Sequence, residues 1–133
     1  MKIDVRLAQN PEGEQIAQLV KDSGFSIEGL SWDIVYPYWI VAEHEEIMVG
    51  AIQVCPSLPV GRLEMLSTAN YMTHRVRAQT VKGLLLAGLE SLRQHGAQMV
   101  SGVIPFKMKA YKRMIRKRGG AVVASGNVIM WKL

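Results

Sequence analysis

The chain has 133 residues, of which 49% are hydrophobic and 20% charged, and its formal net charge is +5; these values predict one globular domain, 1–133, with a core of its own. No run approaches the roughly 20 apolar residues of a membrane span, and the first residues lack the apolar centre of an export signal. A single cysteine, Cys55, excludes an intrachain disulfide and a cysteine-based zinc cluster, so we expect an intracellular, cytoplasmic protein in a reducing environment.

The N-terminal half predicts a strand, a helix and a hairpin. IDVRLA alternates apolar and polar residues from Ile3, which is typical of a strand. Asn10 and Pro11 provide a capping residue and a proline suited to a first helical turn, and the helix that follows ends at Gly24. Residues 25–37 are irregular, and we expect a loop with a short helix there. The runs YWIVAE and IMVGAIQV, separated by three polar residues, indicate a β-hairpin.

The C-terminal half continues with alternating strands and helices. A third strand is expected from Gly61 to about Leu66, and an apolar-faced helix from Arg77 to His95. A strand over 98–103, a basic helix that ends near Arg118, and a final hairpin of AVVA and VIMWKL complete the order β-α-β-β-β-α-β-α-β-β. This order predicts an α/β (mixed α+β) fold, a mixed sheet with helices on both faces. Because VIMWKL is apolar, we also consider that it pairs across a homodimer.

Charge is distributed unevenly along the chain. Residues 1–90 carry 7 basic and 11 acidic side chains, a net of −4, whereas residues 91–133 carry 9 basic and no acidic ones. The basic side chains of the last predicted helix have two interpretations. They form an ordinary solvated face, or they bind a polyanion or an acidic protein surface; the residues concerned are Lys109, Lys112, Arg113 and Arg116. The segment has no recognised nucleic-acid-binding motif, and neither His44 nor His95 has a neighbour at metal-ligand spacing, so no metal site is predicted.

Three stretches resemble the GNAT acyltransferase superfamily. WIVAEHEEIMVGAIQV is similar to its second and third strands, where an Ala-Glu run turns back through a polar hairpin into Val-Gly. GLLLAGLESLRQHGAQMV resembles its coenzyme-binding helix and the next strand, and AYKRMIRKRGGAVV resembles its last helix. The resemblance spans nearly the whole chain and implies a GNAT-like N-acetyltransferase that transfers an acetyl group from acetyl-CoA to a primary amine. The basic last helix is similar to that of small acetyltransferase-like proteins of bacteriophages.

The resemblance implies a cofactor site between the third strand and the long helix. The family has a bulge in this strand, which exposes backbone amides to the acetyl carbonyl. Its pyrophosphate loop (Arg or Gln, two residues, then Gly-x-Gly or Gly-x-Ala) aligns with Arg77 first and with Thr80 and Lys82 in place of the glycines. The expected cofactor residues are Leu66, Ser67, Thr68, Arg75, Arg77, Ala78, Gln79, Thr80, Val81 and Lys82. The cluster of His74, Arg75 and Arg77 has a second interpretation, as exposed residues before a helix whose dipole disfavours cations.

Acetyl transfer to an amine needs a base and donors for the oxyanion. In the family a glutamate on a central strand is commonly the base, so Glu64 is the first candidate and Glu43 the second. The alternative for Glu64 is a solvated residue opposite a lysine on a neighbouring strand. The family's tyrosine that protonates the leaving thiolate falls on Ile115, with Tyr111 one turn earlier. The residues expected on the acceptor side are Trp32, Asp33 and Tyr36.

The departures from the family pattern support a second function of a different class. The loop lacks its glycines, and the tyrosine position carries isoleucine. Both changes are also expected of a GNAT-fold protein without catalysis. Such a protein would use its basic C-terminal helix to bind a polyanion or an acidic partner.

Overall fold

The computed structural model describes residues 2–27, 29–103, 109–122 and 128–132, and confirms the expected order of elements. Two short 3-10 turns and the short helix expected within residues 25–37 are added to that order. The elements are β1 (Asp4–Leu7), η1 (Asn10–Glu12), α1 (Gly13–Asp22), α2 (Trp32–Val35), η2 (Tyr36–Tyr38), β2 (Trp39–His44), β3 (Ile47–Cys55), β4 (Val60–Thr68), α3 (His74–Gln94), β5 (Met99–Val103), α4 (Lys109–Lys117), β6 (Ala121–Val122) and β7 (Val128–Lys132).

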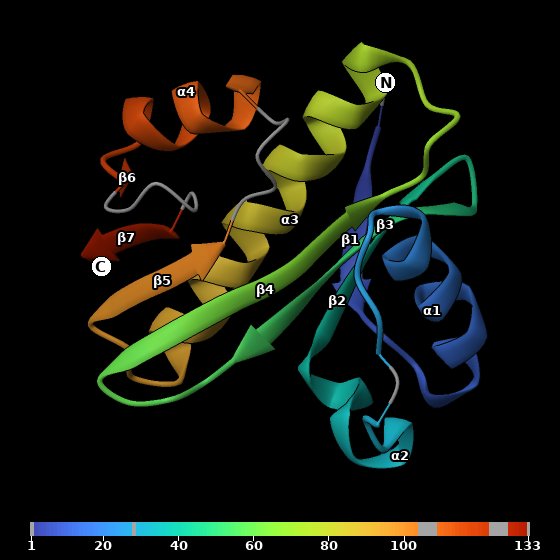
Figure 1. Cartoon of the computed structure of the whole chain (residues 1–133), viewed down its shortest axis with the longest axis horizontal. Helices are drawn as coiled ribbons and strands as arrows, with labels where there is room; N and C mark the ends of the chain where they lie inside the picture. The colour runs from blue at the N-terminus through green and yellow to red at the C-terminus, as the bar shows by residue number, and fades with distance from the viewer. Residues whose placement is uncertain (1, 28, 104–108, 123–127, 133) are drawn as a thin grey trace.

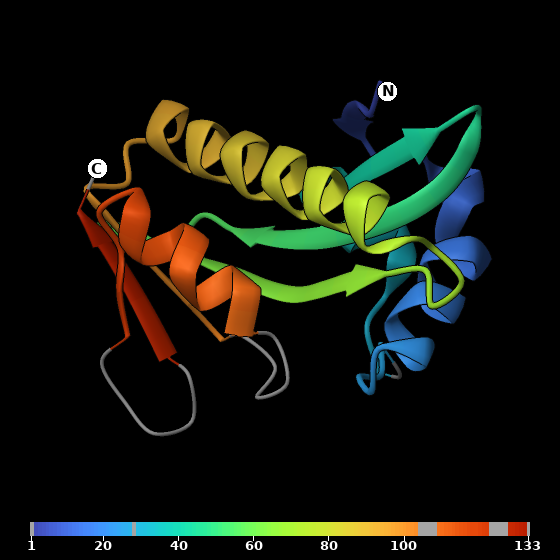
Figure 2. The ribbon, with the colours of Figure 1, turned by 90° about the horizontal axis from the view of Figure 1, so that it is seen from above.

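The strands form one mixed sheet in the order β1-β2-β3-β4-β5-β7-β6 (Figure 1). The β4 and β5 strands run parallel, whereas the other neighbouring strands run antiparallel. The parallel pair is joined through α3, which crosses one face of the sheet, and α1 packs on the opposite face (Figures 1 and 2). The predicted mixed sheet with helices on both faces is therefore confirmed.

Alternation along the strands divides the core between the two faces. On β2, Ile40 and Ala42 pack in the cluster under α3, whereas Trp39 and Val41 pack in the cluster under α1. The α3 cluster also contains Ile115 of α4, which is 1% exposed. Because a strand side chain changes face at every residue, one hydrophobic run supplies both clusters.

The long helix begins earlier than expected. The sequence prediction placed its start at Arg77, but α3 begins at His74, with Thr73 as its N-cap. The Thr73 hydroxyl accepts a hydrogen bond from the Val76 amide at 3.3 Å, which is the ordinary capping contact of a threonine. The predicted start was wrong because the Thr73 cap lets the helix begin three residues before Arg77.

The C-terminal strands complete the sheet. The β7 strand lies between β5 and β6, with Met130 paired to Ser101 on one side and to Ala121 on the other. Ile129 and Met130 are therefore paired on both edges of β7, and a homodimer formed through this strand stays a prediction. The turn expected at residues 125–127 lies outside the described residues.

Among the described residues, no helix combines the length and the apolar character that crossing a membrane requires.

Candidate functional site

An irregularity in β4 marks the centre of the candidate site. Ala51 of β3 pairs with Ser67, and Gln53 pairs with Glu64, so two steps along β3 correspond to three along β4. The extra residue is accommodated at Met65, whose φ of +55° is unusual for a residue with a side chain. Such a bulge turns backbone groups out of the regular ladder. The bulge implied by the family resemblance is present at the expected segment.

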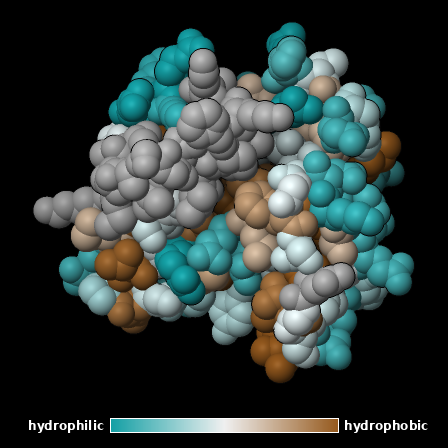
Figure 3. Space-filling view, in the orientation of Figure 1, coloured by the Kyte–Doolittle hydropathy of each residue, from teal (hydrophilic) through white to brown (hydrophobic). Residues whose placement is uncertain are grey.

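The strands β4 and β5 part at the same point. Their parallel pairing runs from Val60 opposite Met99 to Leu63 opposite Gly102. The β4 strand continues to Thr68, and in the described part of the chain its β5-facing edge has no strand partner from Glu64 onward. At the end of β4, Thr68 exchanges hydrogen bonds with the Ser23 hydroxyl: its N–H donates at 3.3 Å and its carbonyl accepts at 3.5 Å. Figure 3 shows apolar surface over the second half of β4, so the edge adjoins an apolar wall.

Glu64 is the residue at which the pairing ends, and it directly precedes the bulge. Its side chain is 34% exposed, and its Oε1 lies 3.3 Å from Nη1 of Arg62 on the same strand. The residue opposite Glu64 on β3 is Gln53. The alternative that Glu64 faces a lysine across the strands is thus wrong, because its cationic neighbour is Arg62. Glu64 is thus a partly exposed carboxylate beside the bulge, and its role as a base stays a prediction.

Glu43, the second candidate base, lies elsewhere. It is on β2, where its Oε1 accepts a hydrogen bond from Nε of Arg6 on β1. The other side of the Arg6 guanidinium donates to both carboxylate oxygens of Glu12, at 2.7 and 2.6 Å. Glu43 is held in an ion-pair network two strands away from the bulge, and its role as a second base stays a prediction.

The predicted pyrophosphate turn is also corrected in part. Residues 78–82 lie in the second and third turns of α3, where helical hydrogen bonding uses their amides. Thr80 is fully buried, and its hydroxyl donates to the Val76 carbonyl at 2.8 Å. Lys82 lines the contact between α3 and α4, beside Met114 and Arg118. The backbone donors assigned to Ala78, Gln79, Thr80, Val81 and Lys82 are therefore already engaged within the helix.

The first turn of α3 offers donors instead. The first N–H groups of a helix have no partner within it, and here Thr73 satisfies those of Val76 and Arg77. The amides of His74 and Arg75 remain for a ligand, and both side chains are exposed. The positive end of the helix dipole and the Arg75 guanidinium favour an anion at this position.

Arg77 holds the loop between β4 and α3. Its Nη2 donates to the carbonyls of Ala69 and Asn70, at 3.5 and 3.3 Å. Its Nε is buried and has no hydrogen-bond partner among the described residues. Arg77 therefore stabilises the loop that leads from the bulge to the helix, whereas Arg75 is the exposed arginine of the first turn.

The loop expected on the acceptor side is fastened to the α1 face of the sheet. Trp32 donates from Nε1 to the Asn10 carbonyl at 2.6 Å, and its ring lies 6.3 Å from those of Tyr36 and Trp39. Trp39 stands opposite Gln53, which stands opposite Glu64, so the loop and Glu64 share one face. Trp32 is mainly a packing residue, whereas Asp33 is exposed to solvent.

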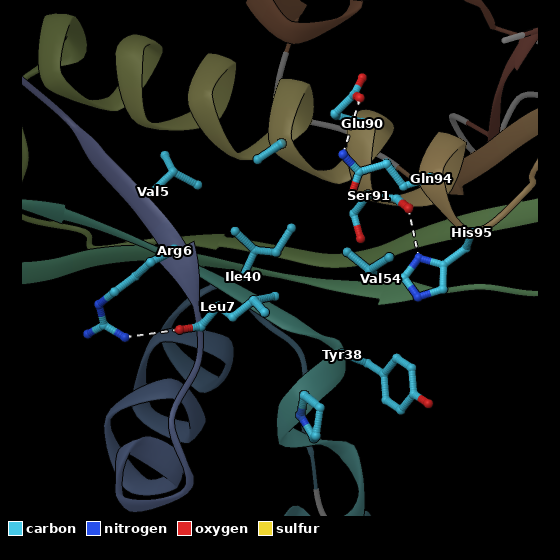
Figure 4. Close-up of a pocket in the computed structure, with 12 residues that line it drawn as sticks. Val5, Arg6, Leu7, Tyr38, Ile40, Val54, Glu90, Ser91, Gln94 and His95 are labelled. Carbon is cyan, nitrogen blue, oxygen red and sulfur yellow. Dashed lines mark hydrogen bonds between the residues drawn. The ribbon is translucent and has the colours of Figure 1, made fainter.

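In the part of the chain that the structure describes, two hollows adjoin the sheet. The larger, about 610 Å³, lies between β1 and the second half of α3, with Leu7, Ile40 and Ser91 in its lining (Figure 4). It opens on the α3 face and does not include Glu64 or the bulge. The smaller, about 310 Å³, is lined by Tyr38, Gln53, Val54, Cys55, Pro56 and Ser57.

The smaller hollow shares Tyr38 and Val54 with the larger one, and its described lining does not include Glu64 or Arg62. Its Gln53 and Cys55 stand opposite Glu64 and Arg62 in the pairing of β3 with β4. Burial raises the pKa of the Cys55 thiol, and the nearby charge of Glu64 raises it further, against the opposing effect of Arg62. The thiol is thus kept neutral, and Cys55 contributes a small apolar wall.

The last helix carries the remaining predicted residues. Ile115 is buried against α3, so the position of the family's tyrosine is filled by a core residue. Arg113 and Arg116 are exposed on α4, and Lys112 is half-buried. The side chains of Lys109 and Tyr111 lie outside what the structure describes. In the described part of the chain, no group of three or more His, Cys, Asp or Glu side chains is placed to hold a metal ion.

Neither a protein-family model nor a curated protein matches the sequence, but solved structures match its fold. N-acetylglutamate synthase from Neisseria gonorrhoeae, solved with coenzyme A and N-acetyl-glutamate, matches at a TM-score of 0.77 and 11% identity over 100% of this chain. The match covers 35% of that synthase, so the chain spans about a third of its length.

Two further structures are similar in size to this chain. The PaiA N-acetyltransferase from Thermoplasma acidophilum, in complex with coenzyme A, has a TM-score of 0.71 and 15% identity over 100% of both chains. Diaminobutyrate acetyltransferase from Paenibacillus lautus, in complex with diaminobutyric acid and coenzyme A, has a TM-score of 0.69 and 15% identity over 98% of this chain and 93% of that one. The chain therefore has the fold of the GNAT N-acetyltransferases.

Proposed function

We propose that the protein is an N-acetyltransferase that transfers an acetyl group from acetyl-CoA to a primary amine. The observation that carries the proposal is the bulge at Met65, which adjoins Glu64 at the point where β4 leaves β5. A partly exposed carboxylate, the bulge and the N-terminus of α3 follow one another along the chain from β4 to α3, which supports the proposal. Structures that share this fold are complexed with coenzyme A, which supports the same cofactor here.

The cofactor would lie along the unpaired edge of β4 and reach the first turn of α3. Backbone groups of Leu66 and Ser67 would hold its acyl arm, because this edge has no strand partner in the described residues. The N–H and carbonyl of Thr68 are bonded to the Ser23 hydroxyl. The amides of His74 and Arg75, with the Arg75 guanidinium, would hold its pyrophosphate. Bound there, acetyl-CoA supplies an activated acetyl group as a thioester.

Glu64 would accept the proton that the attacking ammonium must lose. A carboxylate in hydrogen-bond reach of the amine is suited to this role, directly or through one water molecule. Bulge amides beside Met65 would stabilise the oxyanion that develops on the acetyl carbonyl. With Ile115 buried in the core, we assign no side chain to the leaving thiolate, which water protonates.

Calorimetric titration with acetyl-CoA, with CoA in parallel, tests the cofactor. We expect micromolar binding to the wild type and an unchanged affinity for Glu64→Gln. With an amine acceptor, Glu64→Gln should lower kcat by about 10² or more, because a general base is typically worth 10²–10⁴. Glu45→Gln, at an exposed hairpin glutamate, is the matched control and should retain full activity. Absence of binding up to millimolar acetyl-CoA would sink the proposal.

A second candidate is a GNAT-fold protein without catalysis that binds a polyanion or an acidic partner. The observation that favours it is the exposure of Arg113 and Arg116 on α4, in a part of the sequence, 91–133, with no acidic residue. Such a surface attracts anions at long range. The salt dependence of its binding distinguishes it from acetyl transfer.

A further inference from the structure

On the face of the sheet beside the bulge, the carboxylate of Glu64 lies next to the guanidinium of Arg62. Glu64 and Arg62 lie 3.3 Å apart, with side chains 34% and 52% exposed. Their neighbours across the strands are neutral, namely Gln53 and Cys55 on β3 and Ser101 on β5. A ligand that approaches this face therefore meets one negative and one positive group side by side.

We propose that the acceptor is a free α-amino acid with an uncharged side chain; this rests on the proposed acetyl transfer. A zwitterion carries its ammonium and carboxylate a few atoms apart, which matches the pair on β4. Its ammonium would bind Glu64, and its carboxylate would bind the planar guanidinium of Arg62, which is suited to two parallel hydrogen bonds. One ion pair within the protein is thereby replaced by two with the ligand.

An amine without a neighbouring carboxylate fits this face less well. It would bind Glu64 alone and break the ion pair between Glu64 and Arg62. Arg62 would then have no anionic partner from the ligand. A peptide N-terminus is such an amine, because its carboxyl group is an amide. The charge pattern therefore discriminates against peptides and simple diamines and in favour of free amino acids.

The smaller hollow accounts for the side chain. Its volume of about 310 Å³ is at the lower end of ligand pockets, roughly 300–1,000 Å³. It adjoins the ion pair through Gln53 and Cys55, which stand opposite Glu64 and Arg62. The other lining residues, Tyr38, Val54, Pro56 and Ser57, are uncharged. An ionised side chain would lose water there without gaining a partner of opposite charge, which selects neutral side chains.

The chemical step is an ordinary aminolysis of a thioester. Glu64 takes one proton from the bound ammonium, and the amine nitrogen forms a bond to the acetyl carbonyl carbon. The carbon–sulfur bond breaks, CoA leaves with its electron pair as a thiolate, and water supplies the proton it gains. The nitrogen loses its second proton to solvent, so the products are an N-acetylamino acid and CoA.

Rates of CoA release with matched acceptors test the inference. L-Methionine, its amide, L-glutamate and L-lysine differ in charge at known positions, and kcat/KM is measured for each. We expect methionine to exceed methioninamide by at least tenfold, and to exceed glutamate and lysine as well. Arg62→Gln should remove the preference over the amide through a higher KM for methionine, and Arg62→Lys should restore part of it. Arg93→Gln, at an exposed arginine on α3, is the control and should keep the wild-type preference.

The outcomes separate this inference from the proposed function. If acetyl-CoA binds and the amide or a peptide is acetylated as well as methionine, the acceptor class is wrong and acetyl transfer stands. A preference that persists in Arg62→Gln would also overturn the role of Arg62. If acetyl-CoA does not bind, both proposals fail together. Thermal melting of each variant guards against misfolding, which is not expected at a half-exposed surface position.

Discussion

At the scale of single residues, Arg6 illustrates how a contact between distant residues organises the N-terminal part. Its guanidinium bridges Glu12 of η1 and Glu43 of β2, and Glu12 also accepts from the Gln9 amide at 2.8 Å. The hydrogen bonds from Arg6 lower the pKa of Glu12 below its ordinary value, and burial opposes this effect only in part. The network fixes the start of α1, whose Gly13 packs against Trp32 of the acceptor loop.

Glu12→Gln should make the protein less sensitive to acid. Because the pKa of Glu12 is lowered in the folded state, its stabilisation is complete above its ordinary value near 4.5 and is lost as pH falls through the folded value. We expect the variant to melt at a lower temperature than the wild type at pH 7 and to lose less of its Tm between pH 6 and 3. Thermal melts across this range, with exposed Glu14→Gln as control, provide the measurement. Parallel curves for wild type and Glu12→Gln would contradict the assignment.

At the scale of elements, glycines in the sheet bring α3 close to the strands. A Cβ built on Gly50 of β3 would lie 2.7 Å from Cγ2 of Thr80 and 3.0 Å from Cδ1 of Leu84. The close approach is thus set by the absence of a side chain on β3 and the presence of a small one on α3. It determines where the first turn of α3 stands relative to the end of β4, and therefore whether both reach one ligand.

Gly50→Ala should destabilise the protein by about 1–3 kcal/mol, the usual cost of overpacking a core. Thr80→Ser removes the Cγ2 that the new Cβ would meet and keeps the hydroxyl that donates to Val76. The double variant should recover part of the loss, because Leu84 and the Ser67 carbonyl, at 3.0 and 3.1 Å, remain close. Urea denaturation of the four proteins measures this coupling. Strictly additive effects would show that the contact does not limit the approach of α3.

At the scale of the whole molecule, the charge is separated along the chain. Residues 1–90 have a net charge of −4, and residues 91–133 of +9. The α4 helix turns Met114 and Ile115 toward α3, while Arg113 and Arg116 are exposed. The fold therefore presents the exposed part of this positive charge on a surface other than the one that carries Glu64.

Heparin binding at several salt concentrations tests whether this surface acts as a polyanion site. If it does, affinity should fall steeply between 50 and 200 mM salt, as counterion release requires, and Arg113→Glu/Arg116→Glu should weaken binding by at least tenfold. Lys2→Glu/Lys21→Glu makes the same change in net charge at exposed positions before α3 and should have a much smaller effect. If the affinity for heparin does not change with salt, or is equal in the two double variants, the proposed polyanion-binding function without catalysis is wrong.

The order of elements was predictable from the sequence because it depends on local patterns. Alternation in IMVGAIQV, the helical spacing from Ile16 to Val20, and the polar turn at Glu45 and Glu46 each act over a few residues. The family resemblance added the segment of the bulge, which the structure confirms, and the assignment of Glu64 as the base, which stays a prediction. These are features that neighbours in the chain decide.

The tertiary structure alone decided which of these residues meet. Glu43 is bonded to Arg6, 37 residues away in the chain, and no local sequence pattern predicts such a pair. The helix α3 begins at His74 with Thr73 as its N-cap. The amides of its first turn therefore precede the segment Arg77 to Lys82 that the family's loop motif indicated. The position of β7 between β5 and β6 likewise follows from pairing between distant segments. Local sequence preferences are compatible with several arrangements of the same elements, and long-range contacts determine which one forms. For this reason the sequence predicted the segments of the candidate site, whereas the tertiary structure determined which residues lie together.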